Sequence, residues 1–263
     1  MIEKLYAFWI LGAVFALLIP ILAWLYVQDP RLVDGINVWS KPVRFSASLS
    51  LFVITLAIVG RWISPEFWSQ SWVANYVWLV ILAIIIEMVW LIYAANSGVR
   101  SHFNFDGGFL TAIYPVMGLV AVSLTSASLV FGLAIWSHAH GTLNPALRDA
   151  IALGFILTFF LTVMTAGALA VTGGALGGTV HGPTDTIIGW RQTGADLRLA
   201  HFISTHAMQI IPAIALGLVL VLPIPMARAL VWLTAGGYIA ITAYLFVGAL
   251  RGQSVPELLK LGS

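Results

Sequence analysis

Long apolar runs separated by short polar segments form the dominant pattern of the sequence. Seven runs approach or exceed the roughly 20 residues that an α-helix needs to cross a bilayer. They cover residues 5–27, 45–63, 72–95, 109–136, 150–171, 202–222 and 229–250. None alternates apolar and polar residues as the strands of a membrane barrel do. The runs therefore predict helices, which satisfy their own backbone hydrogen bonds in lipid.

The composition supports the same fold class. Hydrophobic residues make up 60% of the chain, charged residues only 8%, and the mean hydropathy is +0.99, which is far from the composition of soluble domains. The first apolar run is longer than the core of a signal peptide and is followed by no clear cleavage motif, so we expect it to be retained. We expect an all-α integral membrane protein in which residues 1–263 form a single domain of seven transmembrane helices.

Several functional classes are excluded by residues that the chain lacks. The absence of cysteine removes disulfides, iron–sulfur clusters, thiolate zinc sites and covalently attached haem. The last apolar run contains no lysine, so a retinal Schiff base is excluded as well. A net charge of only +2, with scattered basic residues, gives no indication of nucleic-acid binding.

Polar residues gather in the loops that follow the first, third and fifth spans. With seven spans, these loops lie on one face together with the C-terminal tail. Eight of the 12 basic residues are there, which favours an N-out, C-in orientation by the positive-inside rule. The eight are Arg31, Lys41, Arg44, Arg100, Arg191, Arg198, Arg251 and Lys260. Because loops on a rigid scaffold commonly carry function, we expect the site on this face.

Glu87 is the one acidic residue deep inside a predicted span. It precedes Asn96 by nine residues, which places it about 13 Å from that end of the helix at ~1.5 Å per residue. An ionised side chain at this depth costs on the order of 2.5–3.5 kcal/mol. Glu87 is therefore either a neutral carboxyl bonded to a neighbouring helix or a catalytic base, ligand or proton carrier.

Three histidines are expected near the same face. His102 lies in the stretch VRSHFNFDGG after the third span, and His201 and His206 lie at the start of the sixth. His206 and Gln209 share a helix face, whereas His201 is about 140° away from His206. We expect Pro212 to bend this helix one turn further along.

These residues predict one pocket with a metal or haem. His102, His201 and His206 are the expected ligands, with Glu87 as the catalytic group. Asp106 falls on the side of His102 in either an extended or a helical segment, so Asp106 and Gln209 are expected to orient the imidazoles. Imidazole and carboxylate ligands suit zinc, iron or copper, and two facing histidines hold haem b.

Arg100, Arg191 and Arg198 are candidates for binding an anion. Guanidinium groups match haem propionates, a lipid phosphate or another anionic group of a lipid or quinone ligand. The simpler alternative is general contact with anionic headgroups at the bilayer surface.

Three functions remain open from the sequence. The first is a membrane metalloprotein that binds a transition metal or haem b, with redox or lipid- or quinone-directed chemistry. The second is an accessory or assembly subunit of a larger membrane complex. The third is a proton-coupled transporter that uses Glu87, with Pro115 and Pro212 interrupting the helices that line its cavity. The sequence leaves open whether the protein is an enzyme.

Overall fold

The structure, a computed structural model, describes residues 2–103, 107–172, 175–176 and 195–259. The described part of the chain is 84% helical, which confirms the predicted helical class. Within the described residues, six helices are long and apolar enough to cross a membrane, and a bent helix pair adds a seventh if it counts as one span. All seven predicted apolar runs therefore coincide with helical segments.

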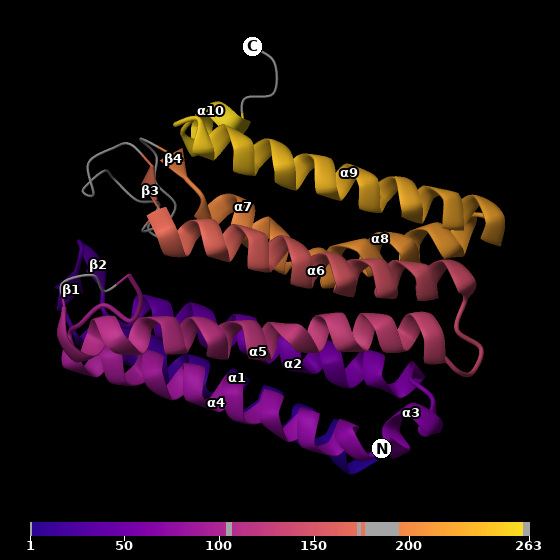
Figure 1. Cartoon of the computed structure of the whole chain (residues 1–263), viewed down its shortest axis with the longest axis horizontal. Coiled ribbons are helices and arrows are strands. Elements are labelled where there is room, and N and C mark those ends of the chain that lie inside the picture. The colour runs from indigo at the N-terminus through magenta and orange to yellow at the C-terminus, as the bar shows by residue number, and fades with distance from the viewer. Residues whose placement is uncertain (1, 104–106, 173–174, 177–194, 260–263) are drawn as a thin grey trace. The chain divides into compact units, whose positions relative to one another are not determined.

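The long helices begin and end near the limits of the apolar runs (Figure 1). They are α1 (Ile2–Gln28), α2 (Ser40–Val59), α4 (Ser71–Ser97), α5 (Gly108–His138), α6 (Pro145–Thr172) and α9 (Ile224–Leu250). The bent pair consists of α7 (Arg198–Thr205) and α8 (Ala207–Val221). Short helical elements are η1 (Gly60–Trp62), α3 (Pro65–Ser69) and α10 (Val255–Leu259). Two antiparallel strand pairs are β1 (Leu32–Val33) with β2 (Ile36–Asn37), and β3 (Ala175–Leu176) with β4 (Ala195–Asp196).

The chain divides into two compact units. Unit 1 comprises residues 1–127 and 138–140, and unit 2 comprises residues 128–137 and 141–263. In unit 1, α2 packs against α1 and α4; in unit 2, α6 packs against α7, α8 and α9. The single seven-helix domain of residues 1–263 stays a prediction.

Helices α1 and α2 pack closely through small residues. Ser46 and Ser50 on α2 donate their hydroxyl hydrogens to the carbonyls of Phe15 and Gly12 on α1, at 2.7 and 2.8 Å. A Cβ at Gly12 would lie only 2.6 Å from a side-chain atom of Ile54. Small residues allow this approach, which is the usual way for apolar helices to associate in lipid.

A hairpin that we did not predict follows α1. Leu32 pairs with Asn37 and Val33 with Ile36. The two turn residues, Asp34 and Gly35, have φ values of 54° and 77°. An Asp-Gly pair with positive φ at both positions is typical of a two-residue hairpin turn, so the sequence held a local signal for this element.

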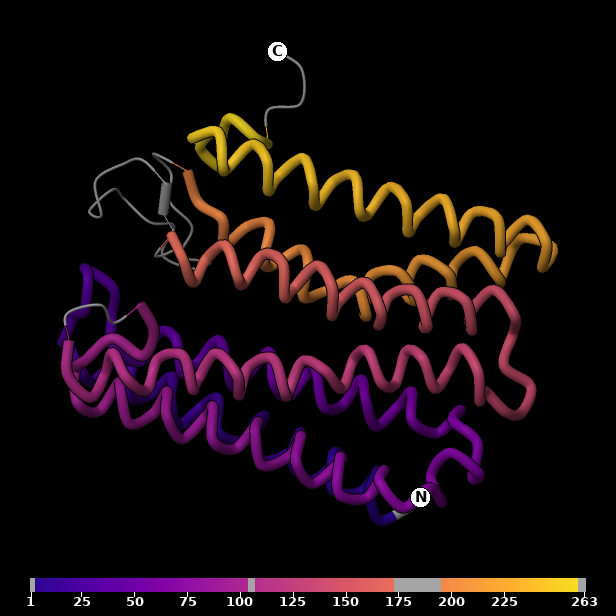
Figure 2. The backbone as a smooth tube through the Cα atoms, viewed as in Figure 1, coloured from indigo at the N-terminus to yellow at the C-terminus, as the bar shows by residue number. Residues whose placement is uncertain are grey.

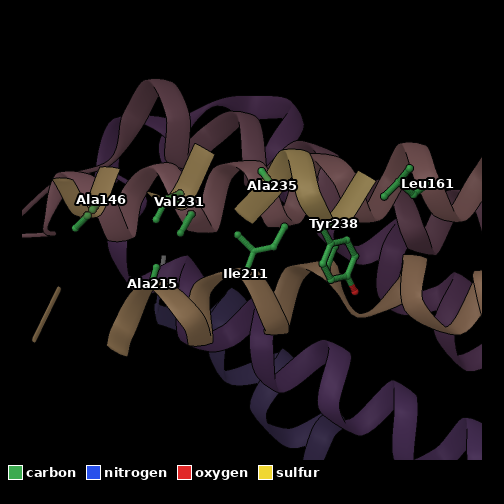
Figure 3. Close-up of a cluster of buried hydrophobic side chains, with 10 residues drawn as sticks. Ala146, Leu161, Ile211, Ala215, Val231, Ala235 and Tyr238 are labelled. Carbon is green, nitrogen blue, oxygen red and sulfur yellow. The ribbon is translucent and has the colours of Figure 1, made fainter. Parts of the chain in front are cut away.

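Small side chains dominate the core of unit 2. Its buried cluster joins α6, α8 and α9 and is drawn in Figure 3. The members are Ala146, Ala150, Leu161, Ala207, Ile211, Ala215, Ala227, Val231, Ala235 and Tyr238. The many alanines leave room for the helix backbones to approach one another.

The sixth predicted span is broken at His206, a position where we did not expect a bend. Helices α7 and α8 meet at 53° on either side of His206, and Figure 2 traces this change of direction. Pro212 lies inside α8, six residues beyond the break. The break at His206 is therefore a separate feature, and the bend expected at Pro212 stays a prediction.

Neighbouring helices explain why the break lies at His206. The carbonyl of Ile203 accepts hydrogen bonds from the His206 amide and from the Tyr238 hydroxyl, whose orientation Figure 3 shows. On the other side of the break, the Met208 amide donates to Thr158 Oγ1 at 2.8 Å. A Cβ at Gly154 would lie 2.7 Å from the carbonyl oxygen of Ala207, so α6 approaches the start of α8 very closely. Tertiary contacts thus satisfy the backbone groups that the interrupted helix leaves.

Candidate functional site

The Glu87 side chain is buried in α4 and is only 1% exposed. Among the described residues, neither of its carboxylate oxygens has a hydrogen-bond partner. His102 Nε2 lies 3.5 Å from Glu87 Oε1. A buried polar group with unfilled hydrogen-bonding capacity is costly, which makes Glu87 the first candidate for chemistry in unit 1.

The loop after α4 folds back toward this helix and carries His102 to Glu87. Gly98 ends α4 with a φ of 66°, a left-handed conformation that glycine adopts without strain. Trp90 on α4 donates from Nε1 to the carbonyl of Ser101 at 2.7 Å. These two local features leave the His102 side chain only 17% exposed.

Lys41, at the start of α2, completes the group. Its Nζ lies 2.8 Å from His102 Nδ1 and 2.7 Å from Ser101 Oγ. A lysine ammonium can only donate, so Nδ1 accepts, and the hydrogen of the neutral imidazole is on Nε2, which faces Glu87. Burial, together with the charge of Lys41, lowers the pKa of His102 well below its ordinary value of 6.5. Lys41, His102 and Glu87 therefore form a row of three ionisable groups.

In the sequence, Lys41 is only one of the eight basic residues on the predicted polar face. Its only notable local feature is its position shortly before the predicted span 45–63, and lysines are common near the ends of transmembrane spans. The contact with His102 spans 61 residues along the chain, and no short-range pattern predicts it.

In unit 2, His201 is held by a hydroxyl from α6. His201 Nδ1 lies 3.0 Å from Thr165 Oγ1, and the same hydroxyl lies 2.8 Å from the carbonyl oxygen of Leu161. We assign the single hydroxyl hydrogen to the shorter contact, so Thr165 Oγ1 accepts from His201 Nδ1–H. The neutral ring then has its lone pair on Nε2, the arrangement found in histidines that bind metals.

His206 lies at the break between α7 and α8. Its ring packs edge-on against Phe202, with ring centroids 4.3 Å apart and planes at 82°. The Gln209 side chain is within hydrogen-bonding reach of the imidazole. His206 therefore lies where the backbone of the sixth span departs from helical geometry.

The residues of the predicted pocket fall into two groups. Glu87 and His102 meet in unit 1, and His201 and His206 lie on α7 and at its end in unit 2. A common pocket for all four stays a prediction. Among the described residues, no group of three or more His, Asp or Glu side chains is placed to hold a metal ion.

Two of the three candidate anion-binding arginines contact carboxylates of the chain itself. Arg100 makes two hydrogen bonds of 2.7 Å to Asp34 in the β1–β2 turn. Arg198 contacts both oxygens of the buried Asp196, at distances from 2.6 to 3.1 Å. Arg191 and Asp106 lie outside the described residues. The roles expected for Arg100, Arg191, Arg198 and Asp106 stay predictions.

No protein-family model, curated protein or solved structure matches this chain at a significant level. Its function is therefore inferred from the contacts of its own residues.

Proposed function

We propose that the protein is a multi-pass membrane protein that couples transport to proton movement, with Glu87 as the proton-binding group. The observation that carries this proposal is the buried Glu87 carboxylate, which has no hydrogen-bond partner within the described parts of the chain and lies 3.5 Å from His102 Nε2. A carboxyl group within a span is costly unless it serves a function or has a partner, and proton carriers use such groups.

The row of three groups offers a path for the proton. In one transfer, the Nε2–H bond of His102 breaks as a proton passes to Glu87 Oε1, and a proton from Lys41 Nζ forms a bond to Nδ1. The imidazole stays neutral, Lys41 becomes an amine and Glu87 becomes a carboxylic acid. Lys41, at the start of α2 and only partly buried, then takes a proton from water. Glu87 then releases its proton either back through His102 and Lys41 or to another group within the membrane span.

The bend at His206 supports a carrier in a second way. Interrupted helices in transporters place backbone groups and polar side chains at the centre of the membrane. Here Thr158 on α6 accepts from the Met208 amide at the break, and Thr165 Oγ1 lies 3.0 Å from His201 Nδ1 on α7. Thr162, also on α6, is buried, and its Oγ1 has no hydrogen-bond partner among the described residues. Such hydroxyl groups are the hydrogen-bonding partners that a small polar solute would require within the membrane span.

The proposal is tested by comparing wild-type protein with Glu87→Gln. Infrared difference spectra over a pH series should show a carboxylic-acid band that Glu87→Gln lacks. In liposomes containing a pH-sensitive dye, solute uptake under a pH gradient should move protons in the wild type and not in Glu87→Gln. Glu66→Gln makes the same chemical change at an exposed residue of α3 and should behave as the wild type. Unchanged spectra and proton flux in Glu87→Gln would overturn the proposal.

A second candidate function, a metal or haem b protein with redox chemistry, is favoured by His201. Its Nδ1 is held by Thr165, and in the part of the chain described here no hydrogen-bond partner lies at Nε2. Purified protein should then show a Soret band or stoichiometric transition metal, and His201→Gln should lose it whereas His138→Gln should not. Wild-type protein produced with haem and metals supplied, and containing neither, would contradict this candidate.

The remaining expectations from the sequence stay predictions. These are an accessory role in a larger complex, and a lipid or quinone ligand at the predicted pocket of Glu87 and the histidines. The N-out, C-in orientation is checked by reacting single cysteines, introduced at the termini of this cysteine-free chain, with an impermeant thiol reagent in intact cells.

A further inference from the structure

A second charged group lies near the start of α6, away from the histidines of unit 2. The Asp149 side chain is completely buried. Its Oδ1 accepts hydrogen bonds from Arg148 Nε and Nη2 at 3.1 and 2.7 Å, and its Oδ2 accepts from Arg228 Nε at 2.8 Å. Two guanidinium groups share one carboxylate, so the group carries a net charge of +1.

Part of each guanidinium stays accessible. The Arg148 and Arg228 side chains are 36% and 45% exposed. Across the described residues, the Arg228 side chain donates only through Nε, to Asp149, so the N–H groups of Nη1 and Nη2 have no protein acceptor.

Aromatic residues mark this end of unit 2 as a membrane boundary. Trp232 follows Arg228 by four residues on α9 and shares its face. Its ring packs edge-on against Trp136, with centroids 6.0 Å apart, and the two side chains are 49% and 44% exposed. Tryptophan at such positions is typical of the interface between headgroups and acyl chains.

We propose that Arg148 and Arg228, held in place by Asp149, bind the phosphate of an anionic phospholipid such as phosphatidylglycerol. Guanidinium groups bind phosphate oxygens in pairs, and the fixed Asp149 contacts reduce the conformational entropy that binding costs. One phosphodiester neutralises the net charge of the group. Trp232 and Trp136 then lie beside the glycerol and upper acyl region of the same lipid.

This inference rests on the proposed insertion into a membrane but not on proton transport by Glu87. The two proposals therefore fail separately, because lipid binding is measured without a pH gradient and Glu87→Gln is expected to bind lipid as the wild type does.

The experiment measures lipids retained by purified protein in native mass spectrometry, with phosphatidylglycerol and phosphatidylcholine supplied in equal amounts. Wild-type protein should prefer phosphatidylglycerol by about tenfold, the equivalent of about 1.4 kcal/mol. Arg228→Gln and Arg148→Gln should each remove most of the preference. Arg228→Lys, which keeps the charge but not the paired donors, should give an intermediate value.

Arg251→Gln is the matched control, because it removes the same charge from an exposed residue at the other end of α9. It should keep the lipid preference, and all variants should elute as the wild type does in gel filtration. Equal retention of the two lipids by wild-type protein, or an undiminished preference in both arginine variants, would overturn the inference. Displacement of the lipid by inorganic phosphate at equal concentration would instead assign the site to a free anion and would also count against it.

Discussion

Lys41 Nζ lies 2.8 Å from Nδ1 of His102, and this contact determines that the other ring nitrogen, Nε2, carries the hydrogen and lies toward Glu87. Because the ammonium occupies Nδ1, the ring hydrogen is on Nε2, the atom nearest to Glu87 Oε1. His102 is thus held between a cation and a carboxyl group while remaining neutral.

We expect the stability of the protein to depend on pH through His102. Its pKa in the folded state lies well below the ordinary value of 6.5 because of burial and the charge of Lys41. The unfolded chain therefore binds more protons below about pH 6.5, so the free energy of unfolding falls as the pH falls through that range and levels off below the folded pKa. Thermal unfolding in detergent at a series of pH values measures this slope.

Two variants check the assignment to His102. His102→Gln should flatten the slope, and Lys41→Met should reduce it, because it removes one of the two causes of the low pKa. If His102→Gln unfolds with the same pH dependence as the wild type, another group is responsible.

Gly154→Ala should destabilise unit 2 by about 1–3 kcal/mol, because the added Cβ would lie 2.7 Å from the Ala207 carbonyl oxygen. Gly167→Ala, also on α6, is the matched control. A Cβ there meets nothing within 4 Å, so the better helix propensity of alanine should raise stability by about 0.5–1 kcal/mol. Denaturant unfolding of both variants measures the difference, and equal effects would contradict the close approach of α6 and α8.

Thr158→Val should weaken the junction between α7 and α8. The change keeps the shape of the side chain but leaves the buried Met208 amide without its acceptor, at a cost of about 1–3 kcal/mol. Thr234→Val on α9 removes a hydroxyl that bonds only within its own helix, to the Leu230 carbonyl, and should cost clearly less. Hydrogen exchange at the Met208 amide reports the loss directly; unchanged exchange there would rule out this role for Thr158.

Asp149→Asn should cost about 2–3 kcal/mol, because it weakens two charge-assisted hydrogen-bonded pairs at a buried carboxylate. Asp34→Asn removes the carboxylate of the exposed pair with Arg100 and should cost at most about 1 kcal/mol. Equal changes in thermal stability for the two variants would show that Asp149 has no special structural role.

The helical class and the approximate position of each long helix follow from the apolar runs alone. In lipid, a run of about 20 apolar residues satisfies its backbone hydrogen bonds as an α-helix. These bonds form within the run, so the helix depends on no contact with a distant segment. The depth of Glu87 in α4 follows from the same counting, as does the common location of His201 and His206 at the start of the sixth span.

Tertiary structure alone decided which polar side chains meet. Lys41 reaches His102 across 61 residues, Arg228 reaches Asp149 across 79, and Thr158 accepts from Met208 across 50. The bend at His206 has no signal in the sequence, because contacts from α6 and α9 stabilise the open backbone at that position. Hydrophobic patterning reports only whether a residue suits lipid, whereas these pairings depend on how the helices pack.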